Sequence, residues 1–114
     1  MRHSIFATLL VLPLAALADS PDCDGPNNWA PSMAHATLKN AGIIDNSKVD
    51  FERTKVVRLA SEKIGGDLYR QVHLVTFVLK DGSEIEAVTV NDASNDECSM
   101  SGVEVMLVRE HFSP

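Results

Sequence analysis

The sequence predicts an α+β domain in which one N-terminal helix packs on a four-stranded antiparallel meander sheet, with one disulfide. Three observations predict it: a segment with helical spacing of apolar residues, four strand-like runs with short connections after it, and two cysteines far apart in the chain. Short connections favour sequential antiparallel pairing of the strands, and a helix is a suitable cover for one face of such a sheet.

The first eighteen residues have the features of a secretory signal peptide. A short polar start is followed by an apolar stretch over residues 5–17 and by an A-x-A cleavage sequence that ends at Ala18. The stretch is too short for a spanning helix of about 20 apolar residues, and Pro13 disfavours the alternative of a buried N-terminal helix. We therefore expect cleavage at Ala18/Asp19, a periplasmic or secreted single domain over residues 19–114, and no membrane anchor.

The charge balance limits the partners. The chain has 10 basic and 16 acidic residues, a formal net charge of −6, and the loss of Arg2 with the signal peptide makes the mature chain more acidic still. This balance argues against nucleic acid and anionic membranes. It permits a basic protein or a cation as partner.

The two cysteines, Cys23 and Cys98, are predicted to form a disulfide, because an exported chain reaches an oxidising compartment. A metal pair or a redox dithiol is the alternative, and no C-x-x-C spacing supports either. The bridge would gather five carboxylates at one end of the domain: Asp22, Asp24, Asp92, Asp96 and Glu97. Calcium prefers such oxygen ligands, but the chain has no EF-hand-type loop, and acidic loops are commonly only solvated. These residues are weak metal candidates, and no cofactor is predicted.

Residues 28–42 are predicted to contain the helix. Asn28 is a suitable N-cap residue, Pro31 is tolerated in the first turn, and Gly42 is suited to the C′ position. Small and apolar residues recur between them at helical spacing: Ala30, Ala34, Thr37, Leu38 and Ala41.

Four strand-like runs follow, over residues 56–62, 68–79, 84–91 and 103–110. The strongest hairpin pattern is Asp81-Gly82 between the second and third runs, because a two-residue type I′ turn requires positive φ at both positions. Gly65-Gly66 is expected to join the first two runs. Residues 45–55 are polar and are interpreted as a connection or an irregular edge segment.

Pairing across these two turns predicts the faces of the sheet. It places Val78 opposite Ile85 and Val57 opposite Leu74. The helix is then expected to cover one apolar face: Val57, Leu59, Val72, Leu74, Thr76, Val78, Ile85 and Ala87. The second face mixes apolar with polar side chains: Val56, Arg58, Ala60, His73, Val75, Phe77, Leu79, Glu84, Glu86, Val88 and Val90.

Part of this mixed face is the candidate binding face, which consists of Val56, Arg58, His73, Val75, Phe77, Val88 and Val90. One short helix covers only one side of a four-stranded sheet, so the other side needs a different cover. Three possibilities stay open. Residues 43–51 or the N-terminal segment fold over it, it is an exposed patch for a protein or ligand, or the register is wrong, which exchanges the two faces.

Motifs for catalysis are few. The histidines at 35, 73 and 111 show no metal-ligand spacing, and the chain has neither H-E-x-x-H nor G-x-S-x-G. Glu84 and Glu86 share a face, as glycosidase carboxylates do, but glutamates beside a turn are usually solvated. No catalytic residue is therefore predicted.

Three parts of the chain resemble small uncharacterised exported proteins of Gram-negative bacteria. These are the signal peptide, the segment from Cys23 to Trp29, and the VNDAS and ECSMSGV sequences at 90–94 and 97–103. The resemblance implies export and brings no activity or functional residue with it.

We expect an exported, non-catalytic binding protein. Its predicted partner is another protein, such as a basic one bound by an inhibitor or immunity protein, or a second copy in a homodimer. The contact is expected through a sheet face or the acidic loops. A small-ligand or lipid carrier is the first alternative, and a small hydrolase is the second.

Overall fold

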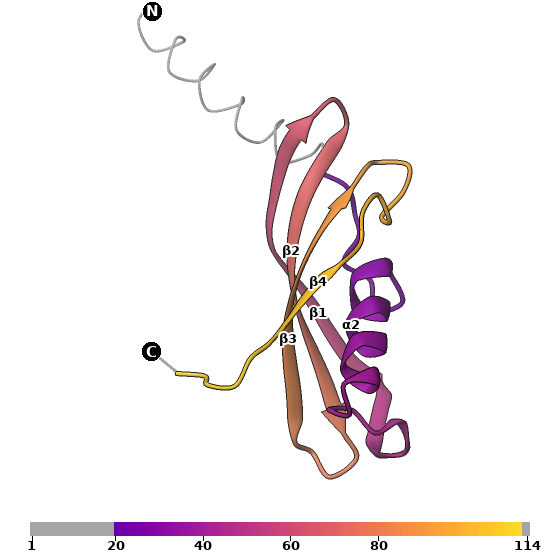
Figure 1. The fold of residues 1–114 in the computed structure, drawn as a ribbon, viewed down its shortest axis with the longest axis vertical. Coiled ribbons are helices and arrows are strands. Elements are labelled where there is room, and N and C mark those ends of the chain that lie inside the picture. Colours follow the sequence, from indigo (N-terminus) through magenta and orange to yellow (C-terminus); the bar gives the residue numbers. More distant parts are fainter. Residues whose placement is uncertain (1–19, 113–114) are drawn as a thin grey trace, which may run out of the picture.

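One α-helix followed by four strands makes up the structure, a computed structural model that describes residues 20–112 (Figure 1). The elements are α2 (Trp29–Asn40), the short 3-10 helix η1 (Asn46–Lys48), β1 (Val49–Gly65), β2 (Leu68–Leu79), β3 (Glu84–Ala93) and β4 (Glu104–Leu107). The strands pair antiparallel in the order β1-β2-β3-β4. The predicted α+β meander is confirmed, whereas the expected signal peptide lies outside the described residues.

Helix α2 begins and ends where local sequence rules place it. Asn28 precedes its first residue in an extended conformation. At the other end Gly42 adopts φ 75°, and the amides of Ile43 and Gly42 donate to the carbonyls of Leu38 and Lys39 at 2.9 and 3.0 Å. This is a Schellman motif, in which a glycine at C′ lets the chain turn back over the last carbonyls.

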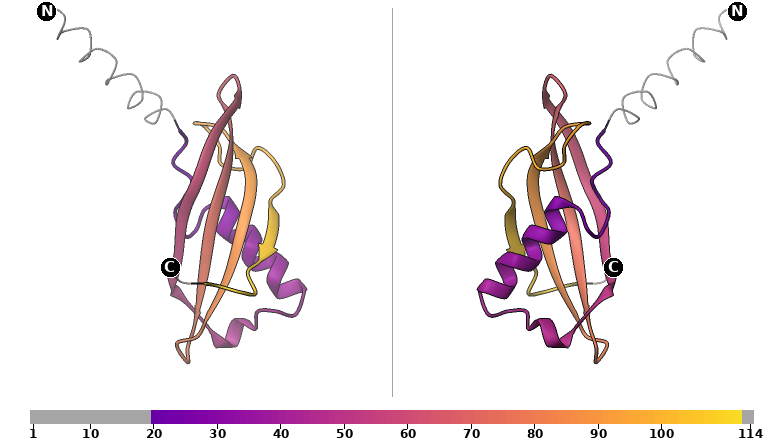
Figure 2. Two further views of the ribbon diagram at one scale, coloured as in Figure 1. Left: turned by 90° about the vertical axis from the view of Figure 1, so that its left-hand side faces the viewer. Right: turned by 90° about the vertical axis from the view of Figure 1, so that its right-hand side faces the viewer.

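Helix α2 covers one face of the sheet, as Figure 2 shows, with the helix behind the strands in the left view and in front of them in the right view. The core between them is made of Ala34, Leu38, Ile44, Val49, Val75, Phe77 and Ala87. The two alanines, one on each side of this interface, are fully buried. Small side chains at these positions allow the helix to approach the sheet closely.

The hairpin between β2 and β3 has a three-residue loop, Lys80–Gly82, in place of the predicted two-residue turn. The amide of Leu79 donates to the carbonyl of Ser83 at 2.8 Å, and the amide of Gly82 donates back to the carbonyl of Leu79 at 2.9 Å. Gly82 has φ 91°, as expected for a type I turn followed by a glycine bulge. Phe77 therefore lies opposite Ile85, and Val78 lies opposite Glu84. The predicted register is wrong by one residue.

Strand β1 is longer and less regular than predicted. It already begins at Val49, and its pairing with β2 is interrupted between Asp50 and Lys55, around Leu59 and near the turn. Val57 lies opposite Leu74 as predicted, but the bulge at Leu59 places Ala60 opposite Val72. Together with β2, this strand extends past β3 as a projecting hairpin (Figure 1).

The disulfide between Cys23 and Cys98 is present, with the two Cα atoms 5.7 Å apart. It ties the N-terminal segment to the loop after β3. The same segment is held on the sheet by the carbonyl of Pro21, which accepts hydrogen bonds at 2.9 Å from the side chains of Gln71 and Arg58. Among residues 20–112, no helix is long and apolar enough to cross a membrane.

Candidate functional site

The predicted candidate binding face does not exist as one surface. His73, Val75 and Phe77 are at most 2% exposed. Val75 and Phe77 belong to the core beneath α2, where Val56 packs against them. The guanidinium of Arg58 bonds to the carbonyl of Pro21.

The other two residues of that predicted face, Val88 and Val90, lie on the opposite side of the sheet. The cause is the three-residue loop, since a shift of one residue in a strand exchanges all its side chains between faces. Ile85 and Ala87 lie under the helix as predicted, but they do so beside Phe77 and Val75. The prediction that the helix also covers Val57, Val72 and Leu74 is wrong, because these residues lie on the opposite side of the sheet together with Glu84 and Glu86.

The face opposite the helix carries an unbroken apolar row across the whole sheet. Val57 of β1 pairs with Leu74 of β2, Leu74 with Val88 of β3, and Val88 with Met106 of β4. Each strand thus contributes one side chain. Neighbouring positions add Leu59 at its bulge and the pair Val72–Val90.

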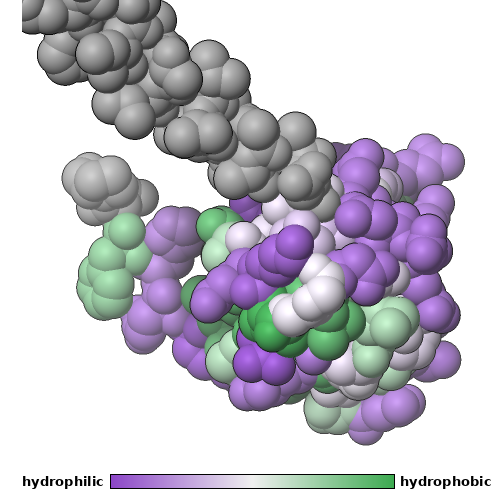
Figure 3. Space-filling view, turned by 90° about the horizontal axis from the view of Figure 1, so that it is seen from above, coloured by the Kyte–Doolittle hydropathy of each residue, from purple (hydrophilic) through white to green (hydrophobic). Residues whose placement is uncertain are grey.

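We call these seven residues the open-face patch: Val57, Leu59, Val72, Leu74, Val88, Val90 and Met106. Val57 is 54% exposed, Leu59 55% and Met106 41%, while the other four are partly buried. Figure 3 looks down the long axis of the molecule and shows, at the end with the projecting hairpin, hydrophobic surface bordered by hydrophilic residues. Large apolar side chains exposed side by side are typical of a binding surface.

The patch has a charged border with an acidic surplus. Lys55 pairs with Glu84 at 3.4 Å, and Arg70 pairs with Asp92 at 3.0 Å. Glu104, opposite Val90, is exposed and makes no ion pair among the described residues. The β3–β4 side of the patch is therefore its more acidic side.

The segment after β4 leaves the sheet on this same face (Figures 1 and 2). The amide of Val108 donates to the carbonyl of Glu86 at 2.9 Å. The Nδ1 atom of His111 lies 3.1 Å from a carboxylate oxygen of Glu86. Phe112 is 85% exposed, so the segment adds another uncovered apolar side chain near the open-face patch.

The acidic residues around the disulfide do not form a metal site in residues 20–112. Asp92 is engaged by Arg70, and Glu97 accepts a hydrogen bond from the hydroxyl of Ser99 at 2.9 Å. A hydrogen bond between the carboxyl groups of Asp22 and Asp24 raises the pKa of Asp22 and lowers the pKa of Asp24. Four of the five weak metal candidates therefore contact other side chains of the chain, and the fifth, Asp96, is exposed.

A block of polar side chains lies buried on the helix side of the sheet. Gln71 pairs with Asn91 and His73 with Thr89 across β2 and β3, and all four are at most 4% exposed. Neither ring nitrogen of His73 has a hydrogen-bond partner among the described residues. Burial lowers the pKa of His73, opposed by the charge of Asp24, so the ring is neutral at pH 7.

The remaining polar candidates for catalysis are separated. His35 bonds to the side chain of Asn46 at 2.7 Å, and His111 contacts Glu86. His73 is inaccessible to an external substrate. Glu84 and Glu86, which could have resembled a glycosidase pair, are engaged by Lys55 and His111. Among the described residues, the contact of His111 with Glu86 is thus the one that joins a histidine of this group to a carboxylate, and His111 is exposed there.

The sequence contains an indication of the correct register. With Phe77 opposite Ile85, the apolar residues of both strands meet under the helix and both glutamates face away from it. The Lys80-Asp81-Gly82 sequence fits a three-residue loop with a final glycine as well as it fits a two-residue turn. Placing Glu84 and Glu86 on the solvent side would have selected the three-residue loop.

Comparisons with known proteins do not extend this description. No protein-family model, no curated protein and no solved structure matches the chain.

Proposed function

We propose that the chain is an exported, non-catalytic binding protein that recognises a basic protein partner through the open-face patch, as an inhibitor or an immunity protein does. The observation that carries this proposal is the row Val57–Leu74–Val88–Met106, which extends over all four strands on the side without a helix. An apolar row of this kind loses contact with water only when another molecule covers it.

The charges favour a basic partner. The chain carries a net charge of −6, and the exposed Glu104 beside the patch has no ion-pair partner in residues 20–112. An acidic border around an apolar centre attracts a partner with basic residues around its own apolar contact. Export rests on the signal-like residues 1–18 and agrees with a disulfide in the mature domain.

A protein is a better occupant of this face than an amphiphile. A carrier buries most of its ligand in a concave site, whereas the open-face patch lies on a single sheet layer with no helix over it (Figure 2). Backbone and side chains of a second protein can cover such a face. A second copy of the chain remains an outcome of the test.

The matched variants Met106→Ser and Met100→Ser test the proposal. Both methionines are exposed, at 41% and 46%, but Met106 belongs to the patch and Met100 to the loop after the disulfide. The mature protein and both variants are used to capture partners from the envelope fraction of the source organism. The retained protein is then purified and its affinity measured by calorimetry.

We expect a basic partner whose complex is weakened by about 1–4 kcal/mol in Met106→Ser, as for an interface anchor, and is unchanged in Met100→Ser. Raising the salt concentration should slow association. Equal affinity of all three proteins, or an acidic partner, would overturn the proposal. Self-association detected by sedimentation, and lost only in Met106→Ser, would replace the basic partner with a second copy.

A further inference from the structure

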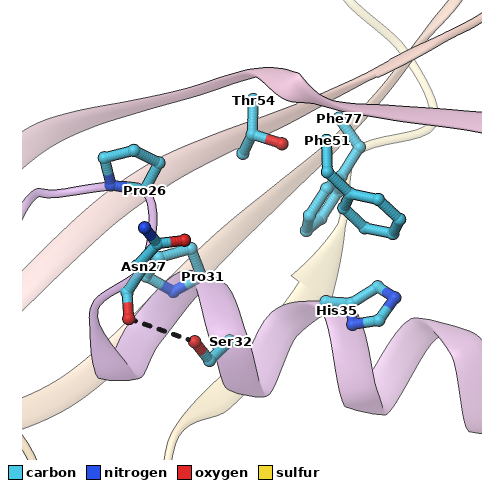
Figure 4. Close-up of a pocket in the computed structure, with 8 residues that line it drawn as sticks. All are labelled: Pro26, Asn27, Pro31, Ser32, His35, Phe51, Thr54 and Phe77. Carbon is cyan, nitrogen blue, oxygen red and sulfur yellow. Dashed lines mark hydrogen bonds between the residues drawn. The ribbon is translucent and has the colours of Figure 1, made fainter.

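A second site lies on the helix side of the sheet, where β1 leaves its regular pairing. Asp50 pairs with Val78 and Lys55 with Thr76, so residues 51–54 of β1 correspond to only one residue of β2, Phe77. Four residues cannot all pair in the hydrogen-bond ladder opposite the single residue Phe77. The extra chain length brings Phe51 and Thr54 toward α2. Figure 4 shows both side chains directed from β1 toward the helix.

The irregular segment and the helix flank a half-open cavity of about 160 Å³. It is lined by Pro26, Asn27, Pro31, Ser32, His35, Phe51, Thr54 and Phe77. An apolar cavity of about 150 Å³ in a protein core is known to accept benzene. The volume is thus sufficient for one six-membered ring with a small substituent.

Rings form one wall of the cavity. The ring of His35 meets the ring of Phe51 edge to face, with centroids 5.0 Å apart and planes at 89°, and lies 6.2 Å from the ring of Phe77. The hydrogen bond of His35 to Asn46 fixes its orientation. An aromatic guest can make further edge-to-face or offset contacts with these rings.

The cavity also contains an unsatisfied hydroxyl. Oγ1 of Thr54 is buried and has no hydrogen-bond partner among the described residues, and Figure 4 shows this hydroxyl on the cavity side of β1. A buried hydroxyl without a partner is costly, so a guest that supplies one gains affinity. No Asp, Glu, Lys or Arg lines the cavity, which disfavours a charged guest because no ion pair would offset its desolvation.

We propose that this cavity binds an uncharged single-ring aromatic group bearing a hydroxyl, a phenol, with Thr54 as its hydrogen-bond partner. The phenol ring can belong to a free small molecule or to a tyrosine side chain of a peptide. The site is separate from the open-face patch, and it does not depend on the function proposed for that face.

Binding is measured on the mature protein by NMR titration with phenol, toluene, benzoate and N-acetyl-tyrosinamide. Phenol should bind saturably, with a Kd of about 1 mM or lower, and shift the amide signals of Ser32, His35, Phe51 and Thr54. Toluene should bind more weakly and benzoate not measurably. Saturable binding of N-acetyl-tyrosinamide identifies a tyrosine side chain as the source of the phenol ring. Binding of phenol alone identifies a free small molecule as that source.

The variant Thr54→Val removes the hydroxyl and keeps the shape. It should weaken phenol binding about three- to tenfold, the effect of one hydrogen bond, and leave toluene unaffected. Thr37→Val is the matched control. Thr37 is exposed on α2, the helix beside the cavity, and it does not line the cavity. Phe51→Ala, which removes part of the aromatic wall from a residue that is 45% exposed, should weaken both ligands.

Absence of saturable shifts up to 20 mM phenol, roughly twenty times the expected Kd, would overturn the proposal. So would benzoate binding as tightly as phenol, or an equal loss of phenol affinity in Thr54→Val and Thr37→Val. Partner binding through Met106 is measured separately, so failure at either site is distinguishable from failure at the other.

Discussion

Phe77 of β2 lies directly opposite Ile85 of β3, and both side chains pack beneath helix α2. This pair decides which side of the sheet is the core. It places Val75 and Ala87 under the helix, and it leaves Leu74 and Val88 together on the uncovered side.

Replacement of Phe77 tests this arrangement. Because Phe77 is 2% exposed, Phe77→Ala should lower the free energy of unfolding by about 3–5 kcal/mol through lost burial and a cavity. Phe112→Ala is the matched control, since Phe112 is 85% exposed and should change stability by less than about 0.5 kcal/mol. Urea denaturation followed by circular dichroism measures both. Similar stabilities of the two variants would contradict the packing of Phe77 under α2.

The neutral, buried His73 should make stability depend on pH. Its pKa in the folded protein is below the value of 6.5 that applies when the chain is unfolded, so the unfolded state binds the proton more readily. The His73 contribution is fully favourable above pH 6.5 and is lost as the pH falls toward the folded-state pKa, by at most about 1.4 kcal/mol per pH unit.

The variant His73→Leu tests this effect, because the carboxylates other than Asp24, which feels the charge of His73, contribute equally in both proteins. The charged groups that act on the ring are Asp24 and Arg58. Denaturation at pH 7.5, 6.5, 5.5 and 4.5 should show that His73→Leu loses less stability than the original protein below pH 6.5. An identical pH profile for His73→Leu and the original protein would refute the role of His73.

Loss of the disulfide should destabilise the fold strongly. The bridge spans a sequence separation of 75 residues, for which the chain-entropy model gives roughly 4 kcal/mol as an upper value. The double variant Cys23→Ser/Cys98→Ser should therefore unfold at lower urea concentration, and hydrogen exchange should rise first in residues 20–28. Intact mass with and without reductant checks the bridge itself, which two alkylatable thiols in exported material would disprove.

Export should be accompanied by cleavage between Ala18 and Asp19. N-terminal sequencing of the protein recovered outside the cytoplasm should begin at Asp19. Ala18→Glu should block processing, because a small residue is required at that position. Ser20→Glu, just after the site, should be processed normally. Recovery of exported protein that begins at Met1 would exclude this cleavage site.

Local features of the fold were predictable from short stretches of sequence. The end of α2 follows from Gly42, whose positive φ closes the Schellman motif with Ile43 and Leu38. The turns near Gly65 and Gly82 follow from the same conformational freedom. Cys23 and Cys98 are the only cysteines in the chain, so an oxidising compartment allows one pairing. Each of these results depends on a few neighbouring residues or on simple pairing.

The tertiary structure decided which face of the sheet is open. Strand side chains alternate with a period of two, so one additional residue in the Lys80–Gly82 loop puts Ile85 and Ala87 on the same side as Phe77 and Val75, and Val88 on the same side as Leu74. Both registers give each strand an apolar side, and the packing of Phe77 and Val75 against α2 decides between them, in agreement with the solvent-side placement of Glu84 and Glu86. The position of the extra β1 residues around Phe51 likewise depends on the helix that they pack against. For this reason the sequence by itself determined the elements, and the contacts between them determined the open-face patch and the cavity.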